Sequence, residues 1–340
     1  MQVSLAGAIR NLPSRPRPLT DLYSEFLAIS SLAEELGFRS VWLSEHHLAE
    51  DNWNSCPMTV LAAIAARTTR IRLGTYVLLL ALHHPLRVAE EIGTLDILSN
   101  GRFDLAIGAG PMHVECKAFG VDPKETFGRT YEALALIKRL FTEERVTHHG
   151  KYYHFDDVCV TTHPVQKPMP PVYTTPLFGP QSWQKSAERG YNVASALHSP
   201  MWLGYAKMLE QHGHKRSDVR IISGPVFVHI ADSRSQAWDE AEEAMHWAVD
   251  FYKKRGLPFP VAPLGEFRKP EHAIAYGLPI AAGTSKEVLE ILSQWKDLPM
   301  DEMSIQFNHP GLALPIVERS MRSFARDIMP EMLRWQPPAA

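Results

Sequence analysis

The chain has 340 residues, of which 45% are hydrophobic and 21% charged, and its formal net charge is -3. This charge argues against a surface for nucleic acid or anionic membrane, because either would need clustered positive charge. Three cysteines, Cys56, Cys116 and Cys159, are an odd and sparse set that does not form a disulfide framework. The longest apolar run, residues 76–82, is far below membrane-spanning length, and the N-terminus does not resemble a secretory signal. We therefore expect a cytoplasmic protein without nucleic-acid or membrane partners.

Apolar runs alternate with amphipathic segments along the whole chain. The predicted strands are residues 3–9, 40–44, 71–80, 102–108, 170–175, 191–196, 220–230 and 303–308. The predicted helices are residues 21–36, 57–67, 86–98, 129–141, 182–189, 200–211, 235–255 and 314–329. A polar stretch around Gly150 predicts a hairpin between the fourth helix and the fifth strand.

Eight strands alternating with helices is the count of a single (β/α)₈ TIM barrel of the α/β class, spanning residues 1–340 as one domain. The alternative architecture is a doubly wound open sheet. Residues 256–283 are rich in Pro and Gly and lack periodicity. Since a loop of that length is usually functional, we expect an insertion near the C-terminal mouth of the barrel that could act as a lid.

The active site of such a barrel gathers at the C-terminal ends of its strands, so polar residues at those ends are the candidates. The second predicted strand ends in Glu45-His46-His47. A histidine there can serve as an acid, a base or a hydrogen-bond donor near neutral pH. His83 and His84 follow the third strand, and His84 is expected to face the pocket. The alternative for each histidine is an ordinary loop residue with satisfied hydrogen bonds.

Glycines occur where two of the predicted strands need close contacts. The fourth strand runs into Gly108-Ala109-Gly110. This is not the dinucleotide-binding fingerprint, because His113 stands where a third glycine is required. The glycines more plausibly make room for a planar, bulky group above the strand end. Gly74 in the third strand likewise lets another group approach the backbone, and tight packing is the alternative.

A glycine and a hydroxyl precede the helix after the fifth strand, in Gly179-Pro180-Gln181-Ser182. A helix N-terminus with outward N–H groups favours a phosphate, and an ordinary N-cap is the alternative. Arg129, at the start of the fourth predicted helix, could add a charged contact or belong to a solvated face.

The sixteen histidines raise the question of a metal site. Three adjacent pairs are present: His46/His47, His83/His84 and His148/His149. Neighbours in a strand point to opposite faces, so an adjacent pair rarely binds one ion. The chain has no His-Glu-x-x-His, paired-cysteine, Gly-x-Ser-x-Gly or Walker-type motif. We therefore expect no metal and neither acyl nor phosphoryl transfer.

Four long segments, residues 37–47, 69–80, 83–103 and 164–173, strongly resemble the bacterial-luciferase-like family of flavin oxidoreductases. The similarity runs in order over nearly the whole chain. The resemblance implies a (β/α)₈ barrel that binds reduced FMN or, in one branch, the deazaflavin F420. In the luciferase branch a separate reductase supplies the reduced flavin, oxygen adds to its C4a atom, and the resulting (hydro)peroxide oxygenates a substrate.

The resemblance also assigns roles to single residues. The family's catalytic histidine matches His46, and its flavin-contacting backbone matches Tyr76-Val77, where a non-proline cis peptide bond is implied. Gly108 and Ala109 stand where luciferase has its reactive cysteine and an arginine, so light emission is not expected. The residues expected to bind the cofactor are Tyr76, Val77, Gly108, Arg129, Gly179, Gln181 and Ser182.

The sequence thus predicts a two-component monooxygenase that holds FMNH₂ in a dry pocket, because water hastens loss of hydrogen peroxide from the oxygenated flavin. The residues expected to shape the substrate pocket are Glu45, Trp42, His84 and Phe178. The expected partners are a small organic substrate, O₂, a separate flavin reductase and a second copy of the chain in a homodimer. The alternatives are an F420-dependent hydride-transfer enzyme, a non-catalytic flavin-binding protein and a metal-dependent barrel hydrolase.

Overall fold

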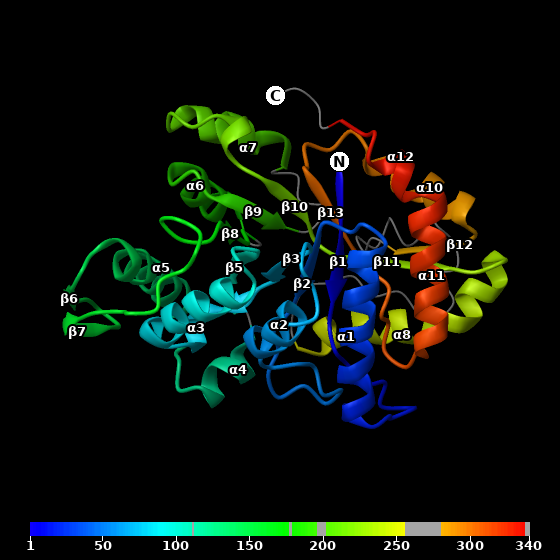
Figure 1. Cartoon of the computed structure of the whole chain (residues 1–340), viewed down its shortest axis with the longest axis horizontal. Coiled ribbons are helices and arrows are strands. Elements are labelled where there is room, and N and C mark those ends of the chain that lie inside the picture. Colours follow the sequence, from blue (N-terminus) through cyan, green and yellow to red (C-terminus); the bar gives the residue numbers. More distant parts are fainter. Residues whose placement is uncertain (111, 177–178, 196–201, 256–279, 337–340) are drawn as a thin grey trace.

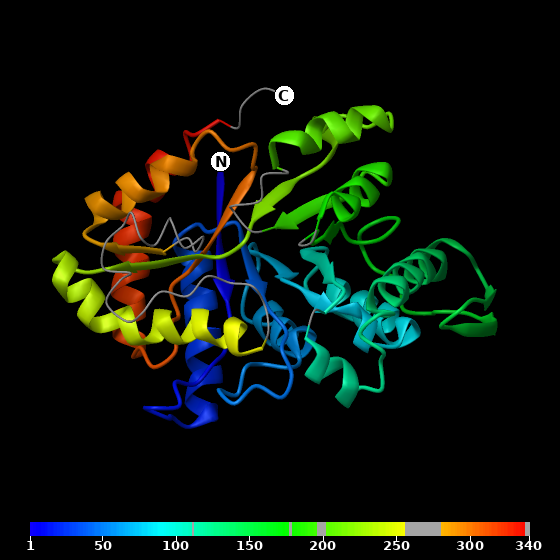
Figure 2. The same cartoon turned by 180° about the vertical axis from the view of Figure 1, so that it is seen from behind.

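The computed structural model describes residues 1–110, 112–176, 179–195, 202–255 and 280–336. Its main sheet closes into a parallel barrel surrounded by helices, as Figures 1 and 2 show from opposite sides. Strand β1 (Gln2–Gly7) closes the barrel, because it pairs in parallel with β2 (Ser40–Leu43) and with β13 (Glu302–Gln306). The predicted (β/α)₈ barrel is therefore confirmed, and the alternative of a doubly wound open sheet is wrong.

The strands of the barrel wall follow one another in chain order. The remaining wall strands are β3 (Arg72–Thr75), β5 (Phe103–Gly108), β8 (Val172–Thr174), β9 (Asn192–Ser195) and β10 (Ile221–Ser223). The longer helices around them are α1 (Leu19–Glu35), α2 (Pro57–Ala65), α3 (Pro85–Leu98), α5 (Thr126–Thr142), α6 (Gly179–Glu188), α7 (Trp202–Gln211), α8 (Arg234–Lys254), α10 (Ser285–Leu292) and α11 (Leu314–Asp327). Two short helices, α4 (His113–Ala118) and α12 (Met329–Met332), complete the set in the described ranges.

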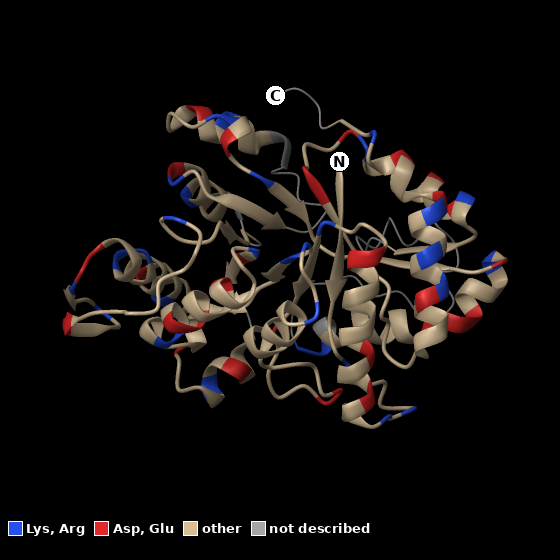
Figure 3. Cartoon of the chain, in the orientation of Figure 1, with Lys and Arg blue, Asp and Glu red and all other residues tan. Residues whose placement is uncertain are grey.

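Charged residues of both signs are spread over the outer helices, while the strands carry few (Figure 3). Strands β2 and β13 are buried at every position, as expected for parallel strands with both faces covered. None of the helices in the described part of the chain combines the length and the apolar character that a bilayer crossing requires.

The barrel interior is filled by side chains around Trp42, which is 1% exposed. The indole packs edge-on against the ring of Tyr173 at a centroid distance of 5.3 Å. A Cβ atom on Gly74 would lie 2.1 Å from this indole, so glycine is needed at that position. The indole Nε1–H donates to Glu302 Oε1 at 2.7 Å, and Glu302 Oε2 forms an ion pair with Arg220 at 3.1 Å. Trp42 therefore belongs to the packed interior of the barrel.

Two of the predicted strands are interrupted. Residues 71–80 divide into β3, the Tyr76–Val77 dipeptide and β4 (Leu78–Leu79). Residues 220–230 divide into β10 and β11 (Val226–Ile230), with Gly224 and Pro225 between them. Proline has no N–H to donate to a neighbouring strand, which explains the break in the ladder.

Strand β11 continues along β13 and takes a new partner, β12 (Ile280–Gly283), which is parallel to it. Residues 256–279 of the predicted insertion lie outside the described residues, and its last four residues form β12. An excursion of β6 (Val146–His149) and β7 (His154–Val158) leaves the barrel after α5. The hairpin expected around Gly150 is confirmed, with the Gly150 N–H donating to the Tyr153 carbonyl at 3.0 Å.

Two buried histidines lie between β11, α8 and α11. His229 Nε2 is 2.6 Å from Glu240 Oε2, and His309 Nε2 donates to the Val228 carbonyl at 3.0 Å. Burial lowers the pKa of His309 to about 3, with a further contribution from His229. Burial also lowers the pKa of His229, against the raising effect of Glu240. Both imidazoles therefore stay neutral under conditions that protonate a solvated histidine.

As the pH decreases below about 6.5, we expect the free energy of unfolding to decrease as well, because the unfolded chain binds protons that the folded chain excludes. For His309 alone the expected loss is about 1.4 kcal/mol per pH unit, or about 2 kcal/mol at pH 5. His309→Gln keeps a donor for Val228 and should remove this loss. Urea denaturation at pH 7.5 and pH 5 measures this difference in the free energy of unfolding, and His84→Gln, at an exposed position, is the control. An equal pH-dependent loss in His309→Gln and wild type would contradict the assignment.

Candidate active site

A cavity of about 270 Å³ lies at the C-terminal ends of β4, β5 and β8. This is close to the lower end of the size range of small-molecule sites. Strand ends, α5 and α6 contribute the residues that line it. The lining residues used below are Val77, Leu79, Gly108, Thr126, Phe127, Thr130, Tyr131, Thr175 and Ser182. Most of the surface they present is apolar, which suits a ligand with a large apolar part.

The floor of the cavity is backbone and small side chains. The peptide bond between Tyr76 and Val77 is cis, so that expectation is confirmed. A Cβ atom on Gly108 would lie 2.5 Å from Val77 Cγ2. The glycine at the end of β5 therefore allows the Val77 side chain to lie close against the strand and form a flat floor.

Several hydroxyl-bearing residues line the cavity, and Thr175 and Ser182 are two of them. Thr175 Oγ1 is buried without a hydrogen-bond partner, although buried polar atoms nearly always have one. Ser182 lies near the start of α6, where the helix dipole is positive. Of the predicted phosphate segment, Gly179 begins α6, Ser182 lines the cavity, and Gln181 is exposed. The hydroxyls of Thr175 and Ser182 thus form a polar end of the cavity.

Helix α5 presents two different faces. Thr126, Phe127, Thr130 and Tyr131 line the cavity. Arg129 lies on the other side, with its guanidinium 5.4 Å from each of the ring centroids of two tyrosines on the hairpin, Tyr152 and Tyr153. The sequence placed Arg129 correctly at the start of this helix, but not on the face that lines the cavity.

Positive charge lies beside the cavity wall in another place. Lys185, on α6, has its Nζ 4.6 Å from the ring centroid of Phe127. Arg189, which directly follows the last residue of α6, lies 5.5 Å from the ring centroid of Tyr131. Neither residue stood out in the sequence, because both look like exposed helix positions.

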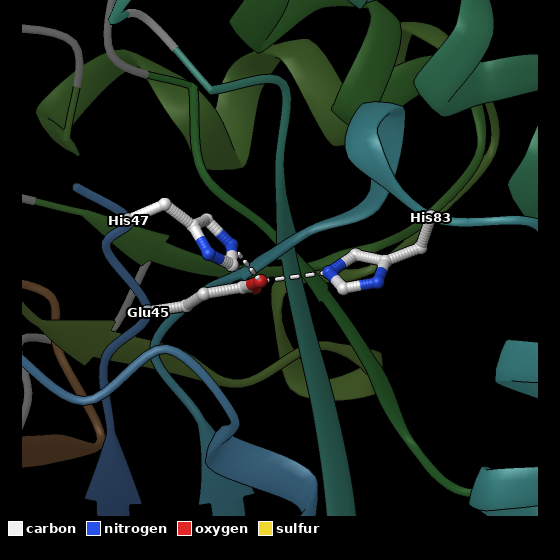
Figure 4. Close-up of side chains that lie close together, drawn as sticks. All are labelled: Glu45, His47 and His83. Atoms are coloured by element: carbon white, nitrogen blue, oxygen red, sulfur yellow. Dashed lines mark hydrogen bonds and ion pairs between the residues drawn. The ribbon is translucent and has the colours of Figure 1, made fainter. Parts of the chain in front are cut away.

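A buried carboxylate joins two loops behind the cavity floor (Figure 4). Glu45 Oε1 accepts hydrogen bonds from His47 Nε2 at 2.8 Å and His83 Nε2 at 2.7 Å. Glu45 Oε2 accepts the backbone N–H of Leu79 at 2.7 Å. Burial raises the pKa of Glu45, but these hydrogen bonds outweigh it and leave the pKa below its ordinary value. An ionised Glu45 thus anchors the cavity wall at Leu79.

His46 is held by a second buried carboxylate. Its Nδ1 lies 3.1 Å from Oε1 of Glu115, on α4, and the same oxygen accepts the backbone N–H of His47 at 2.8 Å. The rings of Trp53 and Phe251 pack against the imidazole at centroid distances of 4.5 and 5.6 Å. Glu115 could not be recognised from the sequence, because the short helix that carries it shows no periodic pattern.

Two of the residues predicted for the substrate pocket, Trp42 and His84, do not line the cavity. Trp42 fills the barrel interior, and Phe178 lies outside the described residues. His84 is exposed, and its ring lies 5.7 Å from that of Phe155 on the hairpin. Its neighbour His83 turns inward to Glu45 instead. Glu45 itself is 1% exposed and supports the wall from behind.

Comparison with known proteins gives related sequences over most of the chain. The luciferase-like monooxygenase family model matches residues 4–293. The oxygenase component of a flavin-dependent trigonelline monooxygenase from Acinetobacter baylyi is 25% identical over 332 residues, 91% of this chain and 89% of that protein. Uncharacterized protein y4wF of Sinorhizobium fredii is 36% identical over 188 residues, and the match spans 55% of each chain.

A relative with another cofactor matches over a shorter stretch. An F420-dependent glucose-6-phosphate dehydrogenase from Kineococcus radiotolerans is 41% identical over 147 residues, 41% of this chain and 42% of that protein. Among solved structures, the monooxygenase RslO1 from Streptomyces bottropensis superposes with a TM-score of 0.84 at 25% identity, covering 97% of this chain and 99% of that one. The barrel, the cis peptide bond at its predicted place and the sequence match agree, and the chain belongs to the luciferase-like monooxygenase family.

Proposed function

We propose that this chain is the oxygenase component of a two-component monooxygenase, which uses reduced FMN and O₂ to oxygenate a small organic substrate. The observation that carries the proposal is the cavity, with an apolar floor at Val77 and Gly108 and a polar end at the start of α6. A flat ring suits the floor, and a phosphate suits a helix N-terminus. When bound, FMN supplies the oxygen chemistry, while the protein positions and shields it.

The polar end of the cavity fits the ribityl and phosphate groups of FMN. The unpartnered Thr175 hydroxyl needs a hydrogen-bond partner, and a ligand in the cavity can provide one. Ser182 and the first backbone N–H groups of α6 would hold the phosphate, and Lys185 would add positive charge beside them.

We propose that His46 moves a proton during the reaction. Glu115 accepts the Nδ1–H of the ring, so the neutral imidazole carries its lone pair on Nε2. That nitrogen can accept a proton or, once protonated, return one. The rings of Trp53 and Phe251 cover the imidazole and limit the access of water.

The alternative function is hydride transfer with F420, which the Kineococcus relative supports. A flavin and a deazaflavin share the tricyclic ring, so both suit the floor of the cavity. O₂ separates the two functions, because only a monooxygenase consumes it. A flavin-binding protein without catalytic activity would bind the ring and transform no substrate.

Anaerobic titration with FMNH₂, followed by admission of O₂, tests the proposed function. We expect one FMNH₂ to bind per chain, and the flavin to pass through a long-lived absorbing state before it returns to oxidised FMN. F420H₂ in place of FMNH₂ is the comparison. Tight binding of F420H₂ with no affinity for FMNH₂ would favour hydride transfer, and no affinity for either would overturn both functions.

Gly108→Ala should weaken FMNH₂ binding by about tenfold, since the overpacking it causes costs on the order of 1–3 kcal/mol. The new methyl group would lie 2.5 Å from Val77 Cγ2 and push that side chain into the cavity. Gly204→Ala is the matched control, because its methyl group would meet nothing closer than Met208 Cε at 3.8 Å. Fluorescence titration measures the FMNH₂ affinity of both variants. If both variants bound FMNH₂ with equal affinity, Val77 would not form part of the surface under the flavin ring.

The proposed partners follow from the same family likeness. The Acinetobacter relative is named as an oxygenase component, which supports a separate reductase for this chain. We also propose a homodimer in the cytoplasm, to be checked by light scattering and cell fractionation.

A further inference from the structure

We propose that Glu45, His47 and His83 form a binding site for one first-row divalent cation of the zinc class. Glu45 and His47 follow β2, and His83 follows the short turn after β4, so two separate loops supply the ligands (Figure 4). The three ligand atoms, Glu45 Oε1 and the two Nε2 atoms, all lie within 4.8 Å of one another. The ligand geometry of this site does not depend on the proposed flavin function.

The chemistry of the three groups suits such an ion. Two imidazole nitrogens and one carboxylate oxygen are the ligands of many zinc sites, which leave a fourth position for water. Around a tetrahedral zinc two ligand atoms lie about 3.4 Å apart. The Glu45 oxygen is now 2.8 Å from His47 Nε2 and 2.7 Å from His83 Nε2. Each imidazole would thus withdraw from the carboxylate by about 0.6 Å, which small side-chain rotations provide.

The carboxylate is already held as a metal ligand would be. The Leu79 N–H donates to Glu45 Oε2 at 2.7 Å, which leaves Oε1 directed between the two imidazoles. Such outer hydrogen bonds orient the ligands of metal sites. No Lys or Arg in the described part of the chain forms an ion pair with Glu45, so a cation would neutralise a buried carboxylate whose partners are two imidazoles and the Leu79 N–H.

The burial of the cluster leaves one side open to solvent. The Glu45 side chain is fully buried, whereas the His47 side chain is 11% exposed and that of His83 27% exposed. An ion would reach the cluster from the side of His83, the more exposed of the two histidines. His46 and His47 turn toward different carboxylates, Glu115 and Glu45. Of the second pair, His83 turns toward Glu45 while His84 is exposed.

Zinc titration of the full-length chain, first freed of metal with a chelator, tests this site. Isothermal titration calorimetry at pH 7.5 with zinc alone should give one site per chain. His83→Gln should weaken zinc binding at least tenfold, and His47→Gln should do the same. His84→Gln is the matched control, because this neighbouring histidine is exposed and faces the hairpin. Its zinc affinity should equal that of the wild type.

Two results would overturn the site. One is a wild-type chain that binds no zinc at stoichiometric concentration. The other is zinc binding that survives His83→Gln and His47→Gln but disappears in His149→Gln, since His149 and His154 form an exposed pair on the hairpin, with ring centroids 6.2 Å apart. Circular dichroism and FMNH₂ titration of the same variants report folding and flavin binding separately. A failure of zinc binding therefore leaves the test of the flavin function intact.

Discussion

Replacing His46 with alanine should lower the rate of product formation by about 10²-fold or more, which is the usual contribution of a positioned acid or base. The imidazole is buried, and Glu115 fixes its orientation through Nδ1 at 3.1 Å. Alanine removes the proton-carrying nitrogen and leaves the Glu115 carboxylate without this donor. The measurement is single-turnover product formation with saturating FMNH₂, O₂ and substrate.

His84→Ala is the control for this experiment, because it removes the same side chain from an exposed position. FMNH₂ affinity is measured for both variants, so that a loss of binding is not taken for a loss of chemistry. A rate in His46→Ala equal to that of the wild type would remove the histidine from the reaction.

Replacing Glu302 with alanine should destabilise the fold by about 3 kcal/mol or more, because it leaves buried donors and charges without their partner. Glu302 is 1% exposed, and its carboxylate accepts hydrogen bonds from Ser40 and Trp42 and pairs with Arg39 and Arg220. Both arginines are about one third exposed, so water compensates part of their loss. We therefore take the lower end of the range for a broken buried pair. Urea denaturation at pH 7.5 gives the free energy of unfolding.

Glu143→Ala breaks a different ion pair and serves as the reference. Glu143 pairs with Arg139 one turn away on α5, and both side chains are well exposed. Exposed pairs of this kind contribute little, so the urea midpoint should not move. If Glu302→Ala and Glu143→Ala unfolded at the same urea concentration, the carboxylate inside the barrel would have no stabilising role.

The strand order could be predicted from the sequence because buried parallel strands are continuous apolar runs separated by amphipathic helices. The breaks within two of these apolar runs could not be predicted from the sequence. Residues 220–230 are mostly apolar, and only the Gly224-Pro225 pair marks the place where β11 leaves β10. Strand β12 is four small or apolar residues next to a Pro- and Gly-rich stretch, too short to show a period.

The candidate site shows the same limit at the level of single side chains. His46, Val77 and Gly108 could be proposed from the sequence because they follow strand ends or match a family motif. Which of two adjacent histidines turns inward depends on the local backbone, and the sequence favoured His84 where the structure turns His83 inward. Glu115 lies 69 positions from His46, and no local pattern connects them.

Helix α5 carries two sets of contacts on opposite sides, one toward the cavity and one toward the hairpin. Substitutions at Thr126 and Thr130 would therefore alter ligand preference, whereas substitutions at Arg129 and Tyr152 would alter the attachment of the hairpin. A single helix thus offers two faces that can be engineered for different properties.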